Sequence, residues 1–295
     1  MGGQSDAFLA HAAKDVTTLC RAWAILRTDG TTFGFTDHDT PLTFDGITFK
    51  ADTGLSAAAL VQSTGLSVDN TEALGALSDV SVREDEIEAG RFDNAEVRAW
   101  LVNWTDPDVR WLQFRGTIGE LRRSGGAFHA ELRGLTEALN RPLGRIYQKP
   151  CTAVLGDGAC RFDLEQPGYR HEGPADRVTN GRVFEWDALN GFEPAWFARG
   201  RLDVLSGAAS GLWGMVKRDV FDEGVRRIEL WEPIRAPISA EDQLRLTVGC
   251  DKRFDTCRLK FNNLLNFQGF PDLPSDDWMM AYPTSGSANT GGSLR

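Results

Sequence analysis

Four of the five cysteines fall in two pairs, and this arrangement constrains the second half of the chain more than any other feature. Cys151 and Cys160 bracket the eight residues TAVLGDGA, Cys250 and Cys257 bracket the six residues DKRFDT, and about ninety residues separate the pairs. Each pair encloses a loop that can present two thiolates to one centre, and Gly156 permits the sharp turn that the first loop needs. The cysteines can therefore tie distant segments together at one site.

Three interpretations fit this spacing. A structural zinc site takes four thiolates, although its pairs are usually spaced by only two to four residues. An iron–sulfur cluster also takes four thiolates and, being larger, accepts wider loops. The third interpretation is four unrelated buried thiols that act as small apolar residues. Spacing alone leaves all three open.

Local sequence around two cysteines predicts helices. The apolar spacing in residues 257–267 predicts a helix with Cys257 near its start, where the helix dipole would lower the thiol pKa. Cys20 lies among apolar residues of a second predicted helix, over residues 8–27, and is expected in the core. Shorter helices are expected near residues 83–90 and over 135–139.

Outside these segments the chain reads as mainly β. Asp45-Gly46 and Asn180-Gly181 each separate two apolar runs, which is a strong hairpin signal. Residues 96–104 alternate apolar and polar positions, and residues 111–135 do so around a Ser-Gly-Gly turn. Short strands at this spacing favour a β-barrel or sandwich. The predicted fold class is thus mainly β with a few helices, an α+β chain.

Composition changes after Pro150, which places a domain boundary near residue 145. We expect a β-rich domain over residues 1–145, a cysteine-containing domain over 146–283 and a flexible tail over 284–295. The tail carries almost no apolar side chains that could order it.

Charge and targeting signals narrow the class of protein. The formal net charge of −10 argues against binding nucleic acid through its phosphates, and acidic walls would suit a conduit past which DNA slides. No apolar run approaches the roughly 18 residues that span a bilayer, and no secretory signal is visible. We therefore expect folding in the cytoplasm, where paired cysteines more often hold a metal than a disulfide.

Other candidate sites have simpler explanations. Asp37-His38-Asp39 is expected to form a turn or interface rather than a metal site, and His11, His129 and His171 share no site. The acidic run at residues 84–88 reads as a solvated helix face. Ser210 is one position off a hydrolase nucleophile turn, and no phosphate-binding loop is present. The pairs Arg122-Arg123 and Arg226-Arg227 are too small for a nucleic-acid footprint. Five tryptophans are candidates for subunit contacts or for the core: Trp100, Trp104, Trp111, Trp213 and Trp231.

A resemblance enters through three blocks of sequence. Residues 249–271 contain Gly-Cys-Asp-Lys-x-Phe-x-Thr-Cys followed by Asn-Phe-x-Gly-Phe-Pro, and resemble the carboxyl-terminal signature of the baseplate hub, or tail-tip, proteins of phages and gene transfer agents. Residues 34–49 resemble the opening of that family. The cysteine pair at 151 and 160, with Gly156 and Asp157 between them, is similar to the family's other cysteine pair.

The resemblance implies a structural role. Three copies would form a ring that continues the tail tube, contacts the distal tail protein and joins tip or fibre proteins, with DNA only as passing cargo. The family is related to the lambda minor tail protein L, which has a similar cysteine arrangement and holds an iron–sulfur cluster. By that analogy Cys151, Cys160, Cys250 and Cys257 would ligate a [4Fe–4S] cluster.

The expected protein is thus a non-enzymatic hub homotrimer in a phage tail or gene transfer agent particle, assembled in the bacterial cytoplasm. One alternative is an iron–sulfur redox enzyme, although no nucleotide fingerprint is visible. The other is the same structural role with a zinc site.

Overall fold

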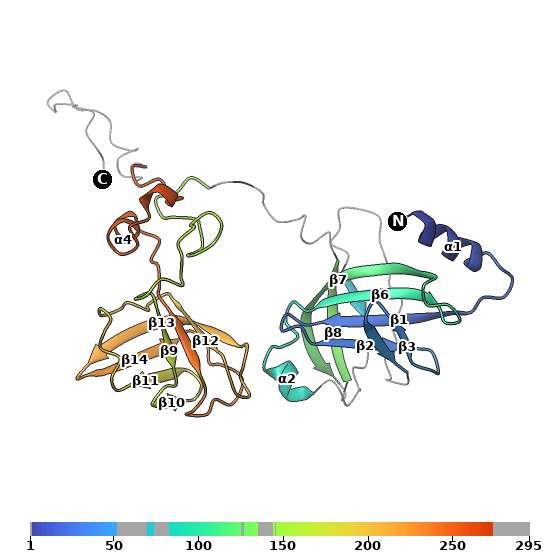
Figure 1. Cartoon of the computed structure of the whole chain (residues 1–295), viewed down its shortest axis with the longest axis horizontal. Coiled ribbons are helices and arrows are strands. Elements are labelled where there is room, and N and C mark those ends of the chain that lie inside the picture. The colour runs from blue at the N-terminus through green and yellow to red at the C-terminus, as the bar shows by residue number, and fades with distance from the viewer. Residues whose placement is uncertain are drawn as a thin grey trace, which may run out of the picture. The chain divides into compact units, whose positions relative to one another are not determined.

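The computed structural model describes residues 2–51, 70–73, 83–124, 127–134, 144 and 146–273. The chain divides into two compact units, Met1–Pro142 and Leu143–Arg295. Each unit is built around a β-sheet with its own buried core (Figure 1). Among the described residues, no helix has the length and apolar character that a membrane crossing requires.

The described part of the first unit contains two helices and one sheet, in the strand order β3-β4-β2-β1-β6-β7-β8-β5. Neighbouring strands are antiparallel except β2 and β4, which are parallel. The elements are α1 (Gly2–Ala12), β1 (Leu19–Leu26), β2 (Thr32–Thr36), β3 (Leu42–Phe44), β4 (Ile47–Lys50), β5 (Asn70–Ala73), α2 (Glu84–Glu88), β6 (Glu96–Asn103), β7 (Arg110–Ser124) and β8 (Ala127–Gly134).

Strand β1 explains how this sheet is buried on both faces. Ala22 and Ala24 point into one core with Trp100, while Ile25 points into a second core with Phe35. On the second face Arg21 is exposed, whereas Trp23 is half-buried and Ile25 is buried, so the strand shows little polar alternation. That is why residues 19–26 read as helix in the sequence and fold as a strand, so the helix predicted over 8–27 is wrong beyond residue 12.

The predicted turn chemistry is confirmed. Asp45 and Gly46 both have positive φ, 51° and 74°, and join β3 to β4. The helix expected near 83–90 is α2, and its acidic side chains are exposed apart from Glu86. The Glu86 carboxylate forms an ion pair with the buried Arg27 and accepts its hydrogen bond at 2.9 Å. The helix expected over 135–139 and the tail over 284–295 lie outside the described residues.

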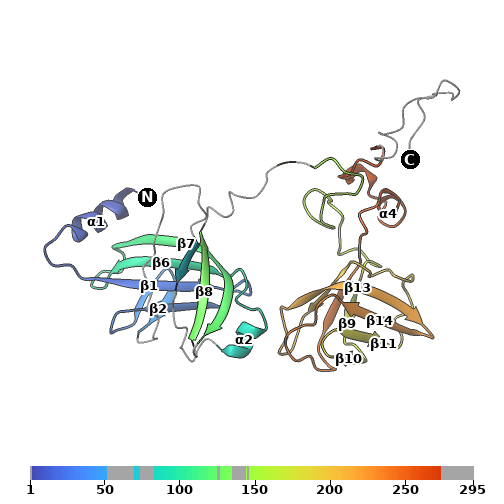
Figure 2. The same ribbon diagram turned by 180° about the vertical axis from the view of Figure 1, so that it is seen from behind.

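The described part of the second unit contains one antiparallel sheet in the order β10-β11-β14-β13-β12-β15-β9, which curls upon itself in Figures 1 and 2. Its elements are β9 (Arg170–Gly173), β10 (Arg177–Thr179), β11 (Val183–Trp186), β12 (Arg201–Val204), β13 (Trp213–Asp222), β14 (Val225–Leu230), β15 (Leu244–Thr247), α4 (Phe254–Leu259) and the 3-10 turn η1 (Leu264–Asn266). The turn predicted at Asn180-Gly181 is confirmed between β10 and β11, with φ of 52° and 61°.

The core of this sheet lies inside the curl. Alternate residues of the strands, such as Phe184, Leu202, Ile228 and Leu246, are fully buried there. The chain segments that carry the cysteines lie at one end of the sheet, beside α4, in both views. Strands β9 and β15 are neighbours and pair Arg170 with Thr247. They therefore bring the segment after Cys160 and the segment before Cys250 to the same edge.

Candidate metal centre

The first cysteine loop is organised by one carboxylate. Asp157 accepts hydrogen bonds from the backbone N–H groups of Val154, Ala159 and Cys160 at 2.8, 2.9 and 2.6 Å. These bonds lower the pKa of Asp157, with the N–H of Cys160 as the largest cause. Gly156 has φ of +83°, as the predicted sharp turn requires. The loop between Cys151 and Cys160 is therefore held by its own polar groups.

The second cysteine segment continues from β15 into α4. Cys250 follows Val248, which packs with Phe162 and Phe261 in a small core beneath the cysteines. Cys257 is the fourth of the six residues of α4 and is buried. The helix is shorter and begins earlier than predicted, and Leu259 and Leu265 are exposed by 76 % and 101 %.

The expectation for the Cys257 thiol is also wrong. Its pKa is raised to about 11, first by burial and then by Cys151, Cys250 and Cys160. Since Cys257 lies in the middle of a short helix, no free helix terminus favours its thiolate. Burial likewise raises the pKa of Cys250, to which Cys151 also contributes. The four thiols thus converge within electrostatic reach of one another.

Hydrogen-bond donors surround the sulfurs. The backbone N–H of Lys252 points to Cys250 Sγ at 3.4 Å, and that of Gln268 points to Cys151 Sγ at 3.4 Å. The Asn263 side-chain amide lies 3.5 Å from Cys160 Sγ. Donors of this kind stabilise thiolates and orient metal ligands.

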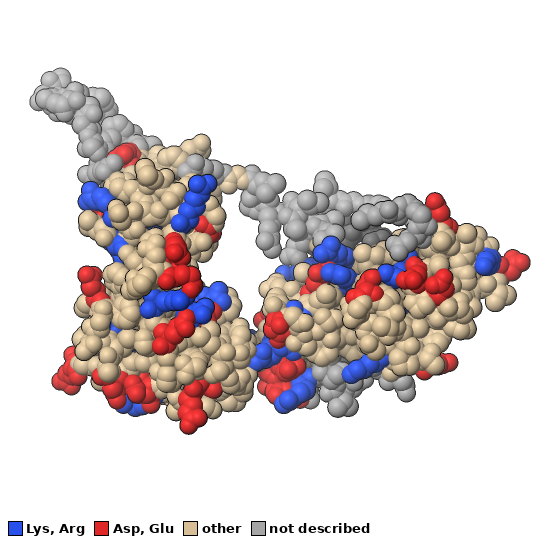
Figure 3. All heavy atoms as spheres, in the orientation of Figure 1, with Lys and Arg blue, Asp and Glu red and all other residues tan. Residues whose placement is uncertain are grey.

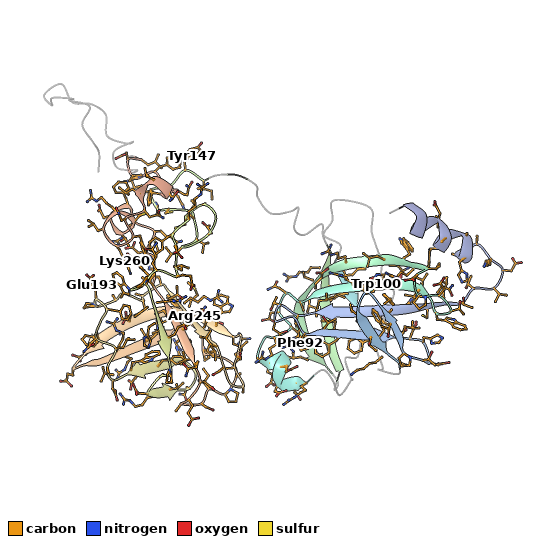
Figure 4. All side chains as sticks on the ribbon, in the orientation of Figure 1. Phe92, Trp100, Tyr147, Glu193, Arg245 and Lys260 are labelled. Carbon is orange, nitrogen blue, oxygen red and sulfur yellow. The ribbon has the colours of Figure 1, made fainter. Side chains whose placement is uncertain are left out.

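Lys260 joins this site to the sheet below it, as Figure 4 shows. Its ammonium donates to the carbonyl oxygens of Trp196 and Gly249 at 2.7 and 3.0 Å and lies 4.3 Å from the centre of the Trp196 ring. Its own carbonyl accepts from the Tyr169 hydroxyl at 2.9 Å. Burial lowers the pKa of Lys260, and the nearby Cys250 opposes that shift.

The donor set fits a thiolate-bound metal group, with four cysteines and an N–H donor beside three of them. Among the residues that the structure describes, however, no three His, Cys, Asp or Glu side chains are gathered as a site for a metal ion. A zinc ion would require its four sulfurs at about 2.3 Å from one point. That arrangement is not present among the described residues.

The fifth cysteine and the other predicted sites stand apart. Cys20 is buried in the core as expected, but on strand β1 rather than on a helix. Asp37-His38-Asp39 forms the expected turn, in which Asp37 accepts from the Arg21 N–H at 2.6 Å.

The remaining candidates are distributed over both units. Ser210 Oγ donates to the Leu205 carbonyl at 3.1 Å, which is a turn contact. His11 binds Thr18 in the first unit, whereas His171 faces the interior of the second sheet. The side chains of His129, Arg122 and Arg123 lie outside the described residues. Of the five tryptophans, Trp100 is buried and the other four are 41–61 % exposed.

Sequence reasoning missed three residues at the site, Lys260, Asn263 and Gln268. Their signal is the set of polar residues within KFNN and within Asn-Phe-Gln, which interrupt an otherwise apolar helix pattern. Such interruptions indicate side chains with polar partners, although not which partners.

Acidic and basic side chains are interspersed on the visible face of each unit (Figure 3). Arg226, the first residue of the Arg226-Arg227 pair noted in the sequence, is fully buried against Asp219. Its neighbour Arg227 pairs with Glu185 at 2.7 Å. This pair forms no basic patch.

Comparisons with known proteins agree over nearly the whole chain. A family described as baseplate hub protein, N-terminal attachment domain, matches residues 5–163, and a phage conserved hypothetical protein family, BR0599, matches residues 195–277. No curated protein matches the chain. A solved chain from "Virion of native gene transfer agent (GTA) particle" is similar, with 53 % identity and a TM-score of 0.89 over 98 % of this chain and 99 % of that one.

The hub family covers more than half of the chain, and the similar structure extends over both units. Both point to a structural virion component rather than an enzyme. This chain belongs to the baseplate hub protein family.

Proposed function

We propose that this chain is the hub at the tail tip of a phage tail or gene transfer agent particle, where three copies form a ring that continues the tail tube. The observation that carries this proposal is the whole-chain similarity to a protein of a gene transfer agent virion. The ring would contact the distal tail protein on one side and tip or fibre proteins on the other. A closed ring needs two different surfaces that meet around the axis, and the exposed tryptophans are candidates for them.

A net charge of −10 supports the passage of DNA through such a ring. Like charges on the wall and on the phosphates repel, so DNA would pass without binding. The tube role is tested by cryo-electron microscopy of particles with a tag on this chain. Tag density in a three-fold ring at the tail tip supports the role, and density elsewhere in the particle refutes it.

The second part of the proposal is a [4Fe–4S] cluster held by Cys151, Cys160, Cys250 and Cys257. It is supported by the convergence of four thiols from two distant segments and by the N–H groups that face them. The loops between the paired cysteines are wider than those of a usual zinc site, and a four-iron cluster accepts wider loops than a single ion. When bound, the group supplies a cross-link between the two segments.

Metal and sulfide analysis of protein purified without oxygen tests this part, together with a visible absorption spectrum. Iron and acid-labile sulfide near four each per chain are expected. About one zinc per chain would refute the cluster, support a zinc site in its place and leave the proposed hub role unchanged. Folded protein that contains neither iron nor zinc would refute the metal centre and support the interpretation of the four cysteines as buried apolar residues.

A further inference from the structure

Asn263 is one of the residues that already join the two cysteine pairs in the metal-free chain. We propose that Asn263 holds both pairs in a single preformed site and that its amide N–H supports the Cys160 sulfur once a metal group binds. The inference rests on the proposed four-cysteine centre and assigns a positioning residue to it.

Asn263 contacts one cysteine of each pair. Its side-chain Nδ2 donates to the Cys160 carbonyl oxygen at 2.7 Å and lies 3.5 Å from Cys160 Sγ. Its backbone carbonyl accepts from the Cys257 thiol at 3.3 Å, and its backbone N–H donates to the Cys257 carbonyl at 3.0 Å. Asn263 thus links Cys160, which is 103 residues away in the sequence, to Cys257, which is 6 residues away.

The orientation of the amide is itself determined. Asn266 Nδ2 donates to Asn263 Oδ1 at 2.7 Å, so the oxygen end of the amide is occupied. The nitrogen end is then left to face Cys160, where a carbonyl oxygen and a sulfur both require a donor. The turn η1, which contains Asn266, therefore serves to orient Asn263.

The other end of the first loop is held by backbone groups. The Cys151 N–H donates to the Lys252 carbonyl at 2.8 Å, and the Gln268 N–H points to Cys151 Sγ. These bonds do not depend on side-chain identity. The Lys252 ammonium also joins the two loops by donating to the Ala153 carbonyl. Asn263 differs from it because its side chain contacts one of the four sulfurs, so a substitution there can loosen the site while the core of the sheet remains intact.

The test uses the full chain with three substitutions. Asn263→Ala removes the donor, and Asn263→Asp keeps the shape but places a second oxygen against the Cys160 carbonyl. Arg258→Ala is the matched control, since its side chain is exposed on α4 and pairs with Asp255 at 3.2 Å. Far-ultraviolet circular dichroism verifies that each variant keeps its sheets.

The first readout is the rate at which metal-free protein reacts with a bulky maleimide. We expect faster labelling of Cys160 in both Asn263 variants, because the side-chain contacts with that cysteine are lost, and no change in Arg258→Ala. The second readout is the rate of iron loss to a chelator after reconstitution with iron and sulfide. Loss of a residue that orients a metal ligand costs about 10- to 100-fold in affinity, with Asn263→Asp the more severe.

The two readouts separate this inference from the proposed centre. If the wild-type chain binds no iron, the centre is wrong, but the labelling rates still report on the asparagine. If the wild-type chain binds iron and both Asn263 variants match it in labelling and in iron retention, the positioning role of Asn263 is refuted.

Discussion

Replacing Asp219 by Asn should cost the second unit about 4 kcal/mol of folding free energy. Asp219 and Arg226 form an ion pair at 2.7 Å in which both side chains are fully buried. Burial raises the pKa of Asp219, and the Arg226 guanidinium opposes that rise. Removing one charge of a buried pair leaves the other uncompensated, which costs roughly 3–5 kcal/mol. The substitution keeps the volume of the side chain, so no cavity adds to this figure.

The Asp219–Arg226 ion pair also affects the cysteine site, because it holds a loop that contacts Lys260. Arg226 also donates to the Leu189 carbonyl at 3.0 Å and to the Phe192 carbonyl at 2.5 Å, and Asp219 accepts from the Phe197 N–H at 2.9 Å. The loop 189–197 is held this way, and its Trp196 carbonyl receives the Lys260 ammonium.

Urea denaturation followed by tryptophan fluorescence measures the loss, with calorimetry as a second probe. At about 2–4 °C per kcal/mol for a domain of this size, the melting temperature of the second unit should fall by roughly 8–16 °C. Arg227→Gln is the control, because Arg227 is exposed and its ion pair with Glu185 should contribute at most about 1 kcal/mol. If Asp219→Asn costs no more than Arg227→Gln, the reasoning about the buried charge is refuted.

The remaining predictions concern a close backbone approach and a buried ring. Gly249→Ala would overlap the Ala198 carbonyl and displace the adjacent Cys250. If the proposed cluster forms, iron retention in this variant should fall by about tenfold. Gly158→Ala, with open space around it, should match the wild-type chain. Burial lowers the pKa of His171 in the folded chain below its ordinary 6.5. The stability that the neutral ring contributes is therefore complete above pH 6.5 and is lost as the pH falls through the pKa of the folded state. Denaturation at pH 7.5 and 5 should show this loss, and His171→Phe should reduce it; an unchanged pH dependence in that variant would contradict the assignment.

Sequence patterns predicted hairpins well because turn chemistry is local. Asp45-Gly46 and Asn180-Gly181 need no distant partner to adopt positive φ. Strand β1 was misread because its neighbours decide its conformation: Ala22 pairs with Thr36 on one side and with Trp100 on the other. A helix-forming composition gives way to such pairing when both faces are buried.

The cysteine positions could be predicted as a group, but their surroundings could not. Spacing and resemblance singled out four residues, whereas Asn263 and Lys260 act through contacts with segments up to about a hundred residues away. The shortened α4 has the same origin, because residues 260–268 give their polar groups to the cysteine loops instead of continuing a helix. Apolar periodicity carries no information about such partners.

Residues near the two ends of the described part of the second unit lie side by side. The Phe270 N–H donates to the Gln148 carbonyl at 2.9 Å, and the rings of Tyr147 and Phe270 lie 4.7 Å apart. Tension applied between residues 146 and 273 would therefore act first on this short junction rather than along the strands. While the junction holds, the sheet between residues 148 and 270 carries no load. Pulling with optical tweezers at residues 146 and 273 should therefore break the junction before any strand unfolds.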